Sequence, residues 1–350
     1  MSDMENNEDN LMTSVDTPKR QWSVVILKNR VVGVLFFELI IIVIFSITAK
    51  RFLTISNLNT IFLNACILAI LACAEAVVII TRNYDVSIAS MLALAAYVGF
   101  DLIKRFPNAG PVVILVPIAI GIVCGLINGS IVAYGRVSSV FVTLGGLSIY
   151  RGIATIYAQG HQIEPKDISV WVRNSVTGSI VPGISNLAII TIAIIVLVSI
   201  YLRYTRIGRQ IYAIGSNPDA ATFYGLKVPK VILGAYVLCG ALTGLSGFLF
   251  AARSSYVVPW FAQGLEMKVI GAVVVGGVSV LGGSGNVIGA ALGAIVLATM
   301  DNGLILIGAH EVVRQLLYGI AIVSACILDA IVLKQVSSLL KSTKRRWARE

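Results

Sequence analysis

The chain has 350 residues, of which 57% are hydrophobic and only 13% are charged. With a mean hydropathy of +0.89, this composition excludes an ordinary soluble domain and indicates a membrane protein with several spans. The formal net charge of +10 does not indicate nucleic-acid binding, because most basic residues lie in short stretches beside apolar runs.

The two ends of the chain are polar and flank a long apolar region. The first thirty residues open with acidic side chains, and no basic start leads into a short apolar core, so they do not form a cleavable signal. We expect a cytosolic polar tail over residues 1–30, a transmembrane domain over 31–333 and a basic cytosolic tail over 334–350.

The apolar region divides into about ten predicted membrane-spanning helices. Segment 86–100 is short for a bilayer, and segment 266–283 is glycine-rich and begins with Glu266 and Lys268. Irregular backbone at membrane depth is tolerated only inside protein or beside water, so the second segment could be re-entrant or broken. The ten segments are 31–49, 58–80, 86–100, 111–134, 139–158, 187–202, 231–252, 266–283, 288–308 and 313–333.

The distribution of Lys and Arg predicts the orientation. With the N-terminus in the cytosol, the cytosolic segments hold 17 of the 27 basic residues and the outside segments hold 7. This asymmetry predicts that both termini are cytosolic. The longest outside loop, about 159–186, is then the natural surface for an extracytoplasmic partner.

Segment 205–227 is a polar, small and basic island between two apolar runs. Asn217 can cap the start of a helix, and Pro218 suits the first helical position. The negative charge of Asp219 is favourable at the positive, N-terminal end of the helix dipole, and Gly225 can end the helix. Such a helix is too short to span a membrane, and it suits a groove on another protein. The alternative is an ordinary loop with one helical turn.

A short internal repeat pairs Asn128-Gly129 with Asn302-Gly303, five predicted spans apart. Two spans that are an odd number of spans apart cross the membrane in opposite directions, so the two halves of the chain are predicted to be inverted repeats. Gly289 and Gly293 form a G-x-x-x-G step that allows close helix contact.

Several kinds of chemistry have no motif in this chain. It contains no G-x-x-x-x-G-K-[ST] phosphate loop, so ATP would have to bind another chain. With two histidines and no Cys/His cluster or Gly-x-Ser-x-Gly, neither a metal site nor an intramembrane enzyme is indicated.

Polar groups within the spans are candidate path residues, because each is costly in lipid. The alternative is internal pairing, for example of Glu75 with Arg151. The candidates are Glu38, Glu75, Asn83, Asp85, Asn128, Arg151, Glu266, Asp301, Asn302 and Arg314.

Several motifs in order, between about Phe52 and Asp329, carry a resemblance to a known family. The first three are Asn83-Tyr84-Asp85-Val86-Ser87-Ile88-Ala89-Ser90, then Asn128-Gly129-Ser130-Ile131-Val132-Ala133, and then Thr143-Leu144-Gly145 with Tyr150-Arg151-Gly152. The fourth motif is discontinuous and consists of Gly208-Arg209, Tyr212-Ala213-Ile214-Gly215, Asn217, Ala220-Ala221 and Gly225. The last two are Gly264-Leu265-Glu266 and the stretch from Gly276 to Gly285. On these motifs the chain resembles the permease subunits of ABC importers for ribose, related monosaccharides and autoinducer-2. Asn83 and Ala89 replace glycines usual in that family. Thr81-Arg82-Asn83 with Tyr150-Arg151-Gly152 is most similar to the autoinducer-2 and rhamnose branches.

The resemblance implies an all-α permease of the bacterial inner membrane that carries no cofactor and is not itself an enzyme. It implies that a periplasmic binding protein delivers the sugar, two permease subunits form the path, and separate ATPase subunits bind ATP and Mg. Residues 217–225 would be the helix that couples the permease to the ATPase. The rival interpretation is a secondary transporter or channel for a small polar solute, which an inverted repeat would suit equally.

The candidate residues fall into two groups, and no metal ligands are predicted. The ATPase-coupling residues are Arg209, Gly215, Asn217, Asp219, Ala220, Ala221 and Gly225. The translocation-path residues are Asn83, Asp85, Ser87, Asn128, Thr143, Glu266 and Asn302.

Overall fold

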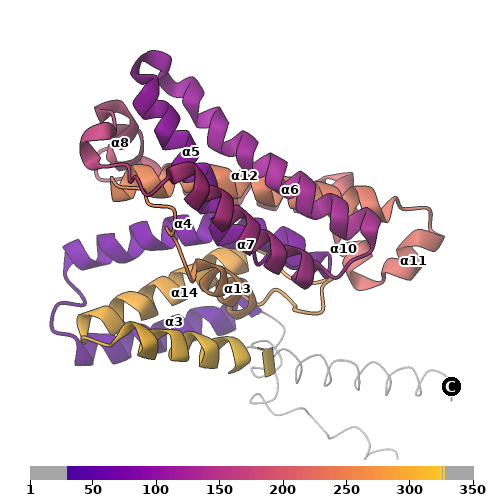
Figure 1. The fold of residues 1–350 in the computed structure, drawn as a ribbon. Coiled ribbons are helices and arrows are strands. Elements are labelled where there is room, and N and C mark those ends of the chain that lie inside the picture. The colour runs from indigo at the N-terminus through magenta and orange to yellow at the C-terminus, as the bar shows by residue number, and fades with distance from the viewer. Residues whose placement is uncertain (1–29, 325, 328–350) are drawn as a thin grey trace, which may run out of the picture.

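The computed structural model describes residues 30–324, 326 and 327, and this part of the chain is built from helices (Figure 1). The predicted 334–350 tail, most of the 1–30 tail and the end of the last predicted span lie outside the described residues. The helices are α3 (Arg30–Thr48), α4 (Ile55–Ile80), α5 (Ile88–Arg105), η2 (Pro107–Ile114), α6 (Leu115–Gly135), α7 (Ser139–Ala158), η3 (Pro165–Asp167), α8 (Val170–Thr177), α9 (Asn186–Tyr204), α10 (Arg206–Ser216), α11 (Pro218–Phe223), α12 (Val228–Ser254), α13 (Leu265–Val275) and α14 (Val287–Leu306). Residues 311–324 form a further helix.

Seven of the described helical segments are long and apolar enough to cross a membrane. They lie in α3, α4, η2 with α6, α7, α9, α12 and α14. The chain is therefore an all-helical, polytopic membrane protein. Three predicted spans are not among the seven: 86–100, 266–283 and 313–333. The helix over the first of these, α5, carries Asp101, Lys104 and Arg105 near its end, and the last runs beyond the described residues.

Helix α4 lies at the centre of the bundle, with α3, α13 and α14 on one side and α5, α6, α7 and α12 on the other (Figure 1). Every residue from Ala65 to Ile80 is buried. Apart from Glu75, this stretch has no charged side chain on any side, and a helix of this kind is stable when other helices surround it, which explains its central position.

Small residues set the closest helix contacts. A Cβ atom added to Gly121 of α6 would lie 2.0 Å from the carbonyl oxygen of Gly240 in α12. In the same way, a Cβ at Gly293 of α14 would lie 2.0 Å from the carbonyl oxygen of Ala272 in α13. The packing interpretation of the Gly289/Gly293 step is thereby confirmed.

Segment 266–283 is a broken helix. Helix α13 ends at Val275 after 11 residues, and a glycine-rich stretch over residues 276–286 leads into α14. We call this stretch the 276–286 loop. It packs against the turn between α4 and α5, where its irregular backbone finds hydrogen-bond partners.

Candidate functional site

Residues 205–227 fold into two helices at one end of the bundle, opposite to α8 (Figure 1). The Asn217 side chain accepts a hydrogen bond from the Ala220 N–H at 3.0 Å, Pro218 takes the first helical turn, and Gly225 adopts a φ of 78°. The predicted helix between Asn217 and Gly225 is thereby confirmed as a local structure. The preceding helix, α10, was not predicted. Thr205 caps it by accepting from the Gly208 N–H.

Two aromatic side chains project from the end of α11. Phe223 is 91% exposed and Tyr224 is 87% exposed. Ala221, in contrast, is buried against its own chain, and Ala220 is half-buried. Exposed aromatic side chains outside membrane-spanning helices are typical anchors for a protein partner.

Next to α11 lies a shallow cavity of about 310 Å³. Its lining residues are Arg206, Arg209, Gln210, Ala213 and Leu226. Arg209, one of the predicted coupling residues, also donates to the Tyr204 carbonyl at 3.2 Å. The two helices thus present a basic, concave surface beside the exposed aromatic pair.

Arg82 ties α10 to the turn between α4 and α5. Its Nε donates to the Gly215 carbonyl at 2.5 Å, and its Nη2 donates to the Ser216 carbonyl at 2.7 Å. These are the last carbonyls of α10, which lack partners within the helix and lie at its negative end. Arg82 itself has a φ of 67°, a conformation that glycine usually supplies after a helix.

The 276–286 loop completes this contact. The Gly283 N–H donates to the Ile80 carbonyl at 2.9 Å, and the Tyr212 hydroxyl of α10 donates to the Gly285 carbonyl at 3.0 Å. A Cβ at Gly215 would lie 1.8 Å from the Ile80 carbonyl oxygen and 2.6 Å from the Gly283 nitrogen. Glycine at position 215 is therefore required by close backbone approach. We call these contacts, between α10, residues 80–84 and the 276–286 loop, the α10 junction.

Behind the α10 junction lies a fully buried polar network. Asp85 Oδ1 accepts from the Ser87 N–H at 2.9 Å and from its hydroxyl at 2.5 Å, while Asn128 Nδ2 donates to Ser87 Oγ at 2.9 Å. The Tyr150 hydroxyl donates to Asn128 Oδ1 at 2.8 Å. Glu75 Oε1 accepts from the Asp85 N–H at 3.0 Å. We call Glu75, Asp85, Ser87, Asn128 and Tyr150 the Asp85 network.

The Asp85 network is connected to the α10 junction through Tyr84. The Tyr84 hydroxyl donates to the Val280 carbonyl at 2.6 Å, and its own carbonyl accepts from the Tyr236 hydroxyl at 2.8 Å. The Val86 N–H donates to Thr143 Oγ1 at 3.1 Å. The turn between α4 and α5 is thus held by α7, α12 and the 276–286 loop.

The structure brings together only some of the predicted path residues. Asp85, Ser87, Asn128 and Thr143 meet around this turn, and each is at most 1% exposed. Asn83 is half-buried in the same turn and donates to Thr81. The remaining two, Glu266 and Asn302, belong to α13 and α14 and lie outside the Asp85 network.

The suggested Glu75–Arg151 ion pair is wrong. Arg151 Nη1 donates instead to the carbonyls of Pro259 and Phe261, at 3.0 and 2.7 Å. Among the described residues, no cluster of three His, Cys, Asp or Glu side chains could hold a metal ion.

Segments predicted to share the outer side are also in contact. Lys104 Nζ lies 3.0 Å from Asp167 Oδ2, and Ile163 pairs with Val257 in an antiparallel bridge. Burial alone would raise the pKa of Asp167, but hydrogen bonds from Lys104 and the Glu164 N–H hold that pKa below its usual value. The carboxylate therefore stays ionised and anchors the loop.

Single-sequence reasoning did not select several residues that build the site as candidates, although four of them stand in the motifs that carry the family resemblance. The five are Arg82, Tyr84, Tyr150, Tyr212 and Tyr236, of which only Tyr236 lies outside those motifs. The hydroxyl or guanidinium of each binds a group 22 or more positions away along the chain. Local sequence carries no signal for such pairings.

Comparisons with known proteins give one consistent result. The family described as "Branched-chain amino acid transport system / permease component" matches residues 57–326. The Autoinducer 2 import system permease protein LsrC of Shigella flexneri is 31% identical over 306 residues, 86% of this chain and 87% of that protein. The LsrC protein of Salmonella paratyphi B is 34% identical over 283 residues, 80% of each.

The Ribose import permease protein RbsC of Escherichia coli K12 is 32% identical over 296 residues, 83% of this chain and 91% of that protein. No solved structure matches. In such importers ATP hydrolysis belongs to a separate subunit, so the chain itself is not an enzyme. The chain belongs to this permease family and is a multi-pass membrane component of a bacterial ABC import system.

Proposed function

We propose that this permease moves a monosaccharide or sugar-like signal of the ribose, rhamnose or autoinducer-2 class. A periplasmic binding protein delivers the solute, and ATPase subunits, which hold ATP and Mg, drive the movement. The support is the set of relatives above, which match over most of both chains and whose names specify ribose or autoinducer 2. The broader family description names branched-chain amino acids, so these serve as the competing solute class.

The α10 junction is the observation that carries the coupling mechanism. An ATPase that seats Phe223 and Tyr224 in a groove would move α11 and α10 together. Arg82 binds both α10 and the end of α4, and so does Gly283, whose carbonyl accepts from the Ser216 hydroxyl at 3.4 Å. The motion of α10 and α11 would therefore reach the turn between α4 and α5 directly. A rigid element of this kind can transmit the partner's motion to the helix bundle, whose path then opens in turn to the two sides of the membrane.

The predicted coupling residues then take different parts. Asn217, Asp219 and Gly225 shape α11, Gly215 allows the close approach at the α10 junction, and Arg209 lines the cavity beside it. Ala221 is buried and Ala220 is half-buried, so they seat α11 on its own chain rather than fill the partner's groove.

We propose that the Asp85 network supports a gate rather than lining the path. Its polar atoms are used by one another, and a group that is fully buried and bonded leaves no atom for a passing sugar. Asn83 and Glu266 are partly exposed and are therefore the better candidates for contact with the solute.

We further propose ten spans in two inverted halves, with residues 31–333 as the permease domain and both termini cytosolic. Two observations support this topology. The two helix pairs with the most extensive contact are α6 with α12 and α4 with α14. Matching α4 to α12 and α6 to α14 converts each of these pairs into the other. The matched helices α6 and α14 also carry the two Asn-Gly steps. A second permease subunit would complete the path, in the bacterial inner membrane.

Reconstituted transport tests the proposal. The complex of permease, ATPase and binding protein is placed in liposomes, and uptake of labelled ribose, rhamnose, autoinducer 2 and leucine is compared with and without ATP. ATP-dependent uptake of one of the first three supports the proposal. Uptake by the permease alone would favour the secondary-transporter alternative, and ATP-dependent uptake of leucine alone would overturn the sugar assignment.

A further inference from the structure

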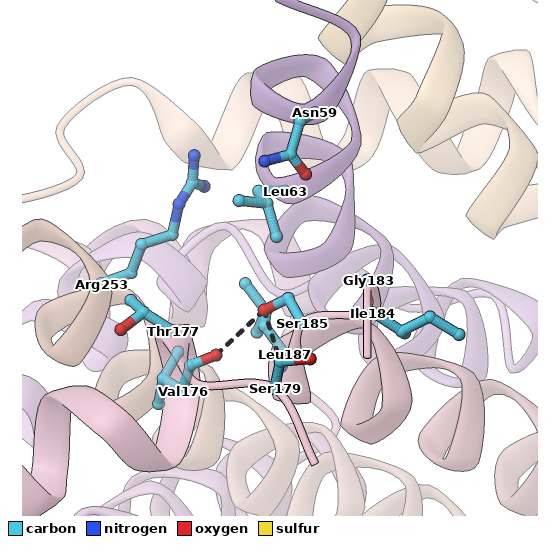
Figure 2. Close-up of a pocket in the computed structure, with 10 residues that line it drawn as sticks. All are labelled: Asn59, Leu63, Val176, Thr177, Ser179, Gly183, Ile184, Ser185, Leu187 and Arg253. Atoms are coloured by element: carbon cyan, nitrogen blue, oxygen red, sulfur yellow. Dashed lines mark hydrogen bonds between the residues drawn. The ribbon is translucent and has the colours of Figure 1, made fainter. Parts of the chain in front are cut away.

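A second cavity lies at the opposite end of the bundle, where α4 and α9 begin and α12 ends (Figure 2). Its volume is about 290 Å³. Three parts of the chain surround it: the first turns of α4, the connection from α8 to α9, and Arg253 near the end of α12. The lining residues are Asn59, Leu63, Val176, Thr177, Ser179, Gly183, Ile184, Ser185, Leu187 and Arg253. The orientation proposed above places this cavity on the outer side.

Arg253 is the one charged residue of this lining, and no carboxylate accompanies it. It is half-buried, and within the described part of the chain its guanidinium has no hydrogen bond or ion pair. Lys104, Arg105 and Lys166, in other segments predicted to lie outside, are paired with carboxylates, whereas Arg173 on α8 is unpaired among the described residues but exposed. A half-buried cation without a partner is costly, so a cavity built around one is suited to an anion.

The hydrogen-bond donors left free in the cavity point to the same chemistry. The Ser185 hydroxyl already donates to the Val176 carbonyl and the Ser179 hydroxyl to the Val181 carbonyl. The side-chain amide of Asn59 has no hydrogen bond to another described residue, and Figure 2 shows the Arg253 side chain pointing toward it. A guanidinium and an amide are a donor pair that fits phosphate oxygens.

Apolar side chains on the same turns of α4 indicate where the rest of the ligand lies. Ile55 is 87% exposed, and Leu58 and Phe62 are each 45% exposed. A cation at the end of a membrane helix, bordered by apolar surface that leads into the bilayer, matches a phosphate headgroup with acyl chains below it. No acidic side chain lines the cavity to receive the ammonium of a zwitterionic headgroup.

We propose that this cavity binds the phosphate of an anionic phospholipid such as phosphatidylglycerol. The site goes beyond the proposed transport function, since it depends on neither the solute nor the ATPase. Losing a charge-assisted contact of this kind should weaken lipid binding by about tenfold or more.

The test uses the assembled importer in detergent, titrated with dioleoyl phosphatidylglycerol or dioleoyl phosphatidylcholine. Bound lipid is counted by native mass spectrometry, and thermal stability is followed in parallel. The variant is Arg253→Gln, and the control is Arg173→Gln, an exposed arginine on neighbouring α8. We expect phosphatidylglycerol to bind and stabilise the wild type and Arg173→Gln, with affinity at least about tenfold lower in Arg253→Gln.

Three outcomes would overturn the proposal. Equal phosphatidylglycerol binding by Arg253→Gln and the control would show that Arg253 holds no headgroup. If free inorganic phosphate raised the thermal stability of the importer as much as phosphatidylglycerol does, the ligand of the cavity would be a soluble anion instead. Weaker binding of the periplasmic partner by Arg253→Gln, with unchanged lipid binding, would assign the cavity to a protein carboxylate.

Discussion

The Nε atom of Arg82 lies 2.5 Å from the carbonyl oxygen of Gly215, 133 positions away in the sequence. This hydrogen bond and its neighbour to Ser216 join the end of α10 to the end of α4. They link the surface proposed for ATPase docking to the turn between α4 and α5 that holds Asp85.

Replacing Arg82 by glycine should uncouple transport from ATP hydrolysis. Arg82→Gly keeps the left-handed backbone at this position and removes two charge-assisted hydrogen bonds, each contributing about 1.5–3 kcal/mol. We expect about tenfold slower uptake while the ATPase still co-purifies and hydrolyses ATP. The control is Arg136→Gly, at an exposed arginine that also has a positive φ after a membrane helix. Uptake that is equally normal in both variants would contradict the role of Arg82.

Gly215→Ala should destabilise the α10 junction. The added methyl group would lie 1.8 Å from the Ile80 carbonyl oxygen, so backbone must move, at a cost of at least about 2 kcal/mol. A lower thermal midpoint of the purified complex and reduced uptake are expected. Gly234→Ala is the matched control, because no heavy atom lies within 4 Å of its added Cβ and α12 is helical there. If both variants melt like the wild type, the close approach at Gly215 is not rigid.

Phe223→Ser should weaken ATPase binding without affecting the fold of the permease. The side chain is 91% exposed, so its loss removes no internal packing. A central aromatic anchor contributes about 2 kcal/mol to an interface, equivalent to about thirtyfold in affinity. Pull-down with the purified ATPase measures the change, and Tyr134→Ser at the exposed end of α6 serves as the control. Unchanged affinity in Phe223→Ser would move the docking surface elsewhere.

The two Asn-Gly steps should respond differently to alanine. Asn128→Ala removes two hydrogen bonds from a buried site, the one from Asn128 to Ser87 Oγ and the one from Tyr150 to Asn128 Oδ1. This loss should cost about 2–4 kcal/mol and lower the thermal midpoint of the complex. Asn302 Oδ1 is buried without a hydrogen-bond partner among the described residues, so Asn302→Ala should cost less. Slow uptake by Asn128→Ala at unchanged stability would instead support path lining.

Side-specific labelling should establish the orientation. Cys66, Cys73, Cys124 and Cys239 are buried, so a Cys326→Ser background suffices. An impermeant maleimide should label Lys166→Cys in intact cells. It should label Tyr224→Cys, on the predicted cytosolic surface, only after permeabilisation. The reverse pattern would overturn the proposed topology.

Local sequence determined the class of protein and the helix around Asn217. The apolar runs can be stable only in a bilayer, and the cap at Asn217 and the stop at Gly225 act within their own helix. These features depend on neighbours along the chain, so the sequence alone was enough to predict them. The same holds for the break in segment 266–283, whose glycines and charges were visible in advance.

Only the tertiary structure decided what the polar residues do. Asp85, Ser87 and Asn128 were candidates for the path because they are polar at membrane depth, yet in the fold they bond to one another. Arg82 was one basic residue among several until Gly215, 133 positions away, was placed beside it. Hydrogen bonds between distant segments depend on how the helices pack, and a single sequence contains no local term that specifies that packing.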